Sequence, residues 1–201
     1  MSQLKRVGLR YVGQTLAGIA LAVAFGGCGA QSAGRRADAS VVNVRGAGFT
    51  LKLPAGYKPG STKSIQGVPA GVASASYTPG GAGGASVPSM VAVLAGNHAA
   101  ASPAQIAQGL HNYYKYMHNG ALTSFASKPA NVPGAKAAEI VHESDLSHVS
   151  GLASKYTRYD DSWLIVETAN DGLREVDAVN EPERGGQLDG DQVIRSFRLT
   201  K

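Results

Sequence analysis

Histidines are the residues of this 201-residue chain whose type could support metal or acid–base chemistry. The ligands of one zinc ion must all lie about 2 Å from it. His111 and His118 are seven residues apart on an expected helix, about 10 Å along its axis, so they cannot share an ion. His142, Glu143 and His148 match a zinc-protease motif in residue type only. That motif places two histidines one helical turn apart, whereas this segment has the pattern of a strand. We therefore expect no metal site.

Some of these side chains could still share a ligand-binding surface once the chain has folded. Tyr114 is a further candidate, although helical spacing divides the neighbouring tyrosines between two faces and favours packing for most of them. The candidate surface comprises His98, His111, Tyr114, His142 and His148. Convergence of His98, His142 or His148 with Glu143 and Asp145 stays open as an alternative.

Motifs for covalent or phosphate chemistry are absent from the sequence. There is no Gly-x-Ser-x-Gly elbow, and the glycine-rich segment 79–86 lacks the Lys-Ser/Thr ending of a phosphate-binding loop. A single cysteine excludes a disulfide framework and a Cys-x-x-Cys site. We therefore predict no catalytic residues, no cofactor and no enzymatic activity. Convergence of Ser, His and Asp in a cleft would reopen the possibility of a hydrolase.

The beginning of the chain has the pattern of an export signal. Lys5, Arg6 and Arg10 precede an apolar run, 11–25, which ends in small residues just before Cys28. The run is shorter than the about 20 residues that a membrane-spanning helix needs. Small residues after a basic start and a short apolar run are typical of a cleaved secretory signal.

Cys28 is the only cysteine in the chain, and it follows the apolar run directly. In this it resembles a bacterial lipoprotein, whose cysteine becomes the lipidated first residue of the mature protein. Cleavage after Ala30, which would release a secreted protein, is the alternative. We predict a signal peptide at 1–27, a flexible tether of small and polar residues at 28–40, and a single domain at 41–201.

Net charge changes when the signal is removed. The whole chain carries +5, but the signal holds three basic residues and no acidic one, so the remainder carries only +2. A nucleic-acid-binding protein needs a clustered basic surface on its folded part. We therefore expect no nucleic-acid partner.

Hydrophobic patterning predicts an α+β domain with an antiparallel sheet flanked by helices. Ser102 and Pro103 are a cap and a first-turn proline, and predict a helix to about His118. Asp171-Gly172 predicts a hairpin with a two-residue loop. Strands are expected at 41–44, 49–53, 72–78, 90–94, 122–127, 135–143, 153–159, 163–168 and 173–179, with a turn at 160–161 and a short helix after 189. Glu139 and Glu143 are expected on solvated strand faces.

Two segments resemble the PsbP-like superfamily of α/β/α sandwiches. They are the FTLKLPAGY stretch at 49–57 and the SFRL stretch at 196–199, and the resemblance covers about 47–200. The superfamily includes a photosystem II extrinsic subunit, a Ran-binding eukaryotic protein and bacterial lipoproteins of the DcrB, LpqN and LpqT kinds. These motifs concern packing and turns, so the resemblance implies the fold and carries over no catalytic residue.

Taken with Cys28, the lipoprotein members imply a non-enzymatic accessory or binding role. We expect the chain to be held by a lipid anchor, palmitate included, on the outer face of the membrane of an actinobacterial cell. Its expected partner is an envelope protein or a cell-wall component. The alternative is a secreted module that binds a small ligand or a metal and delivers it to a transporter.

Overall fold

The computed structural model describes residues 41–46, 48–60, 73–80, 88–96, 101–117, 122–148 and 156–200. The predicted signal peptide and tether, with Cys28, lie outside these ranges, as does His98. Within them, no helix combines the length and the apolar character needed to cross a membrane.

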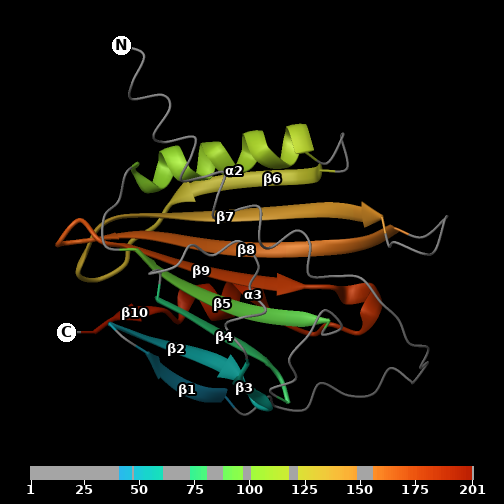
Figure 1. Ribbon diagram of the computed structural model, residues 1–201, viewed down its shortest axis with the longest axis horizontal. Helices are drawn as coiled ribbons and strands as arrows, with labels where there is room; N and C mark the ends of the chain where they lie inside the picture. The colour runs from blue at the N-terminus through green and yellow to red at the C-terminus, as the bar shows by residue number, and fades with distance from the viewer. Residues whose placement is uncertain are drawn as a thin grey trace.

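Two antiparallel sheets make up the β structure (Figure 1). The larger sheet has the order β3-β4-β5-β9-β8-β7-β6, and the smaller one has the order β1-β2-β10. The strands of the larger sheet are β3 (Tyr57–Pro59), β4 (Ala73–Pro79), β5 (Ser89–Gly96), β6 (Leu122–Pro129), β7 (Ala135–His148), β8 (Tyr156–Thr168) and β9 (Leu173–Asn180). Those of the smaller sheet are β1 (Val41–Gly46), β2 (Phe49–Pro54) and β10 (Arg198–Leu199).

Helix α2 (Pro103–Met117) begins where the sequence predicts. The backbone N–H of Gln105 donates to Ser102 Oγ at 3.3 Å, and the backbone N–H of Ser102 donates to Gln105 Oε1 at 2.9 Å. This reciprocal pair is a capping box, which satisfies two N–H groups at the start of the helix. Ile106 and Leu110 on its apolar stripe are buried, as expected.

Helix α2 covers one face of the larger sheet, and the smaller sheet covers the opposite face. α2 packs on Val141, Trp163 and Ile165, whereas β2 and the short helix α3 (Gly190–Arg195) pack on the alternate residues Leu164 and Val166. Because successive side chains of a strand point to opposite faces, α2 and α3 lie on different sides of the sheet. A 3-10 turn, η2 (Pro182–Arg184), connects β9 to the segment before α3. The predicted class, an antiparallel sheet flanked by helices, is confirmed.

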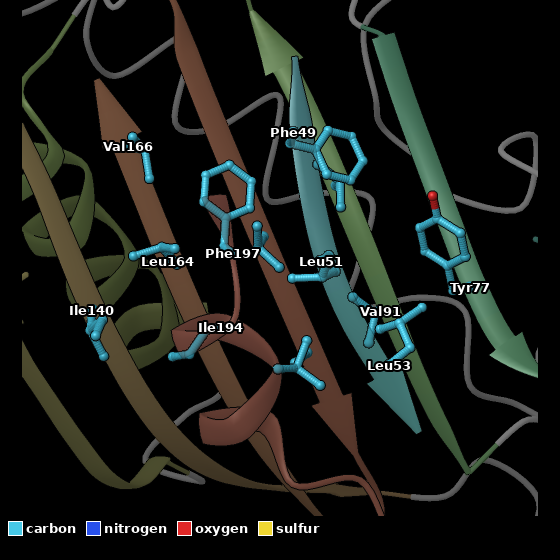
Figure 2. Packing of buried hydrophobic residues seen from close by; sticks show 14 of the residues in the cluster. Phe49, Leu51, Leu53, Tyr77, Val91, Ile140, Leu164, Val166, Ile194 and Phe197 are labelled. Atoms are coloured by element: carbon cyan, nitrogen blue, oxygen red, sulfur yellow. The ribbon is translucent and has the colours of Figure 1, made fainter. Parts of the chain in front are cut away.

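The main hydrophobic core lies between the larger sheet and the smaller one. Phe49, Leu51 and Leu53 project from β2 onto the larger sheet, where they meet Phe197 and Ile194 from the C-terminal segment (Figure 2). The rings of Phe49 and Phe197 stack with their centroids 6.0 Å apart. The alternating Phe-x-Leu-x-Leu pattern therefore fills one side of this core.

Three details differ from the predictions. Asp160 and Asp161 do not form a turn: they lie within the continuous strand β8 and pair with Ser144 and Glu143 of β7. β3 follows Pro54 after a short turn and had no apolar alternation to reveal it. The β8–β9 hairpin is present, but its loop has three residues, 169–171, closed by the N–H of Thr168 donating to the carbonyl of Gly172 at 2.8 Å. Within this loop only Asp171 has a positive φ, 56°.

Candidate functional site

Acidic side chains lie on the α2 side of the larger sheet. The same side of these strands also carries core residues. We call this set the acidic α2 face. Every member is at most 6% exposed. Its members are Glu139, Glu143 and Asp145 on β7, Asp161 on β8, and Glu175 and Asp177 on β9. The expectation that Glu139 and Glu143 are solvated is therefore wrong, because the covered face of this sheet leaves them little access to water.

Strand register determines which of these groups are neighbours. Glu143 faces Asp161 across β7 and β8, and Trp163 faces Asp177 across β8 and β9. Directly opposed residues of antiparallel strands have Cβ atoms about 4.5–5.5 Å apart. The carboxylates thus form a row that crosses three adjacent strands, and the indole of Trp163 lies within that row.

Several buried polar atoms of the row have no hydrogen-bond partner in the described part of the chain. They are both carboxylate oxygens of Asp177, Oδ1 of Asp161 and Nε1 of Trp163. Asp177 is 1% exposed and Trp163 is 2% exposed. A buried polar group without a partner costs about 1–3 kcal/mol, and a charged one costs more. Glu181, at the end of β9, shows the contrasting arrangement, because it is equally buried but pairs with Arg184 at 2.9 Å.

Burial changes the acidity of this face. Desolvation is the largest cause in each case, and it raises the pKa of Glu175 to about 7. It raises the pKa of Asp161 to about 7 as well, where a hydrogen bond with Glu143 acts in the opposite direction. The pKa of Asp177 rises well above its usual range, with further contributions from the charges of Asp161 and Glu175. Near neutral pH the carboxyl groups of Asp161 and Glu175 are therefore divided between protonated and ionised forms.

On the opposite face, His142 lies between Ser162 on the sheet and Asp191 on α3. His142 Nδ1 lies 3.3 Å from Ser162 Oγ, and His142 Nε2 lies 3.1 Å from Asp191 Oδ1. These are the residue types of a hydrolase triad, but the surroundings of the serine do not suit a nucleophile. A Cβ added to Gly190 would lie 2.6 Å from Ser162 Oγ, so the backbone of α3 occupies the space over the hydroxyl. The contacts of His142 with Ser162 and Asp191 therefore hold α3 against the sheet.

The predicted histidine and tyrosine surface is not brought together. His111 stacks on Phe125 of β6, with ring centroids 4.5 Å apart, on the α2 side of the sheet, whereas His142 contacts α3 on the other side. Tyr114 belongs to α2 and His148 to β7, but their side chains lie outside the described set, as does all of His98. His142 also points away from Glu143, because adjacent residues of a strand face opposite sides.

Across the described ranges, no group of three His, Cys, Asp or Glu side chains is placed to hold a metal ion.

The acidic α2 face itself was missed by sequence reasoning. One signal for it was available: Glu175 and Asp177 alternate within the strand LREVDAV, which lies beside the strongest strand of the chain.

Comparisons with known proteins concern the fold. No protein-family model matches the chain, and no curated protein matches it. Among solved structures, it is similar to the Saccharomyces cerevisiae Ran-binding protein Mog1p, with 10% identity, 80% of this chain and 96% of that chain covered, and a TM-score of 0.46.

Two bacterial structures show a weaker likeness. A Bacteroides thetaiotaomicron protein is 13% identical, with 76% of this chain and 45% of that chain covered and a TM-score of 0.41. A Pseudomonas aeruginosa protein of unknown function is 14% identical, with 72% and 85% covered and a TM-score of 0.36. No function of this chain follows from these likenesses.

Proposed function

We propose that this protein is a membrane-anchored extracytoplasmic lipoprotein with a non-enzymatic binding role at the cell envelope. The observation that carries the proposal is the place of the only cysteine. Cys28 lies directly after a short apolar run with a basic start, and the first described strand begins thirteen residues later at Val41. A diacylglycerol on that cysteine would hold the domain at the membrane through the intervening small and polar residues.

The arrangement of the domain is compatible with such an anchor. The chain enters the fold at β1, in the smaller sheet, which packs on the α3 side of the larger sheet. The acidic α2 face lies on the other side, away from the strand that follows the proposed anchor. A ligand or partner bound on the α2 side would therefore not compete with the smaller sheet for space.

The experiment compares the wild type with Cys28→Ala, each produced in an actinobacterial host. Intact mass and detergent-phase partitioning are measured for both proteins. We expect the wild type alone to carry a diacylglycerol mass and to enter the detergent phase. If both proteins remain in the aqueous phase and begin at Gln31, the anchor proposal is wrong and the protein is secreted in free form.

A second candidate is a module that binds a small ligand and delivers it to a transporter. It is supported by the buried polar atoms of Asp161, Trp163 and Asp177 that have no partner among the described residues. A bound ligand would satisfy atoms that the fold itself leaves unsatisfied. Native mass spectrometry of the protein purified from its own cells tests this candidate. A bound small molecule that is present on the wild type and lost from Asp177→Asn supports it, and a wild type without bound mass contradicts it.

A further inference from the structure

The outer face of the smaller sheet carries three basic side chains. Thr50 on β2 is opposed to Arg45 of β1 on one side and to Arg198 of β10 on the other. Directly opposed residues of antiparallel strands share a face, and Lys52 shares it too, because it lies two residues from Thr50 on the same strand. The three basic side chains are exposed, whereas the alternate residues of β2 are buried in the main core. We call Arg45, Lys52 and Arg198 the basic outer face.

The charge of this face is not neutralised within the fold. No Asp or Glu occurs in residues 41–60 or 192–201, and in the described part of the chain none of the three cations makes an ion pair. Asp191 on α3 is engaged by His142 and Arg195. The strand spacing places the backbones of the three cations within about 10 Å of one another, which is about one Debye length at 0.1 M salt. Their fields therefore add over a single anionic surface.

The chain enters the fold on this same face. Val41, the first residue of β1, is opposed to Pro54 and lies four residues from Arg45, on the same side of the strand. Among the described residues, the large apolar side chains that are most exposed are Val41 at 47% and Val42 at 41%. Thirteen residues lead from Cys28 to Val41, and they reach at most about 47 Å when fully extended. A lipid on Cys28 would therefore keep the basic outer face within reach of the membrane.

We propose that the basic outer face docks on a membrane surface that contains anionic phospholipid, and that it turns the α2 side of the anchored domain away from the membrane. A Lys or Arg near such a surface contributes about fivefold in affinity, so three contribute about 100-fold. That is weak for a free protein, but the anchor makes the contact intramolecular and supplies a high effective concentration. The exposed apolar side chains at the start of β1 add contact with the headgroup region. This inference rests on the proposed anchor.

Energy transfer from a fluorophore on the protein to labelled lipid headgroups measures the orientation of the domain. The lipoprotein with Asn43→Cys carries the fluorophore on the basic outer face, and the lipoprotein with Gln108→Cys carries it on the exposed side of α2. Both are inserted into vesicles of phosphatidylcholine, with or without an equal part of phosphatidylglycerol. We expect phosphatidylglycerol to raise the transfer from position 43 and to lower the transfer from position 108. Raised salt should reverse both changes, because it screens the attraction.

Charge variants test whether this face is responsible. Arg45→Gln combined with Lys52→Gln should lower the ratio of docked to undocked domains by about 25-fold, the product of two fivefold losses. Arg198 is left in place because its guanidinium also donates to backbone carbonyl groups. The control combines Lys115→Gln on α2 with Lys128→Gln on β6, at the far end of the molecule (Figure 1). It removes the same charge and should change the ratio by less than about twofold, with circular dichroism confirming that both proteins are folded.

Flotation of the vesicles separates this inference from the anchor. Protein that floats with both kinds of vesicle, but whose energy transfer does not depend on phosphatidylglycerol, overturns the inference and leaves the anchor intact. The face would then serve an anionic partner other than lipid. Equal losses in the two double variants also overturn it, because net charge and not this face would control the orientation. Protein that floats with neither kind of vesicle lacks the anchor, and that result overturns the proposed function together with the inference.

Discussion

Glu175→Gln should stabilise the protein in a pH-dependent way. Glu175 faces Ile165 on β8 and Leu94 on β5, so its carboxyl group lies among apolar side chains. Burial raises its pKa from 4.5 to about 7. A difference of about 2.5 in pKa, at about 1.4 kcal/mol for each pKa unit, corresponds to about 3 kcal/mol. Glutamine has the same shape and does not ionise.

The direction of the effect follows from proton binding. Between pH 4.5 and 7 the unfolded chain releases the proton of Glu175 while the folded chain keeps it, so the free energy of unfolding of the wild type falls across this window. Above pH 7 the loss is complete. We therefore expect the stability of the variant, relative to wild type, to rise by about 3 kcal/mol between pH 4 and pH 8.

Urea denaturation of both proteins at a series of pH values measures this difference. The other titrating groups are common to the two proteins, and their contributions largely cancel, except that of Asp177, whose pKa the charge of Glu175 raises. Glu183→Gln, which removes an exposed carboxylate, is the matched control for the loss of one negative charge. A stability difference that stays flat from pH 4 to pH 8, or that falls, would show that Glu175 is not desolvated in the way the sheet implies.

Three further predictions concern the α3 side. Gly190→Ala should destabilise the fold by about 1–3 kcal/mol, because its Cβ would lie 2.6 Å from Ser162 Oγ, and Ser162→Gly in the same chain should restore most of the loss in urea denaturation. Phe197→Ala should cost about 3–5 kcal/mol, measured in the same way, because the ring is 1% exposed and stacks on Phe49. His142→Ala should cost only about 0.5 kcal/mol, because both partners of its ion pair are more than a third exposed and water screens the interaction.

The start of α2 and the strand β2 could be predicted because each depends on residues close together in the sequence. Ser102 and Pro103 specify the start of α2 through a cap and a missing N–H, and both effects act within one turn. The alternation of Phe49, Leu51 and Leu53 predicted a strand with one buried face, and this face lies in the main core. Such signals need no knowledge of the rest of the chain.

The candidate site depended on information that the local pattern does not contain. Glu139 and Glu143 alternate with other residues in the same way on a solvated strand as on a covered one, so the local pattern does not decide their burial. The contact of His142 with Asp191 joins β7 to a helix far along the chain. Asp160 and Asp161 have the composition of a turn, but pairing with β7 on one side and β9 on the other keeps them in a strand.

The two faces of the larger sheet therefore contribute differently to stability. The α3 face holds the larger apolar core. On the α2 face a smaller apolar cluster lies beside buried carboxylates, which destabilise the fold as the pH rises from about 4 to about 7. Natural proteins tend to break the rules of core composition at functional sites. Measuring stability and bound small-molecule mass on wild type and Asp177→Asn tests whether this acid serves a ligand or only weakens the fold. A gain in stability with loss of a bound mass means that the acid serves a ligand, whereas a gain in stability with no bound mass on either protein means that the acid only weakens the fold.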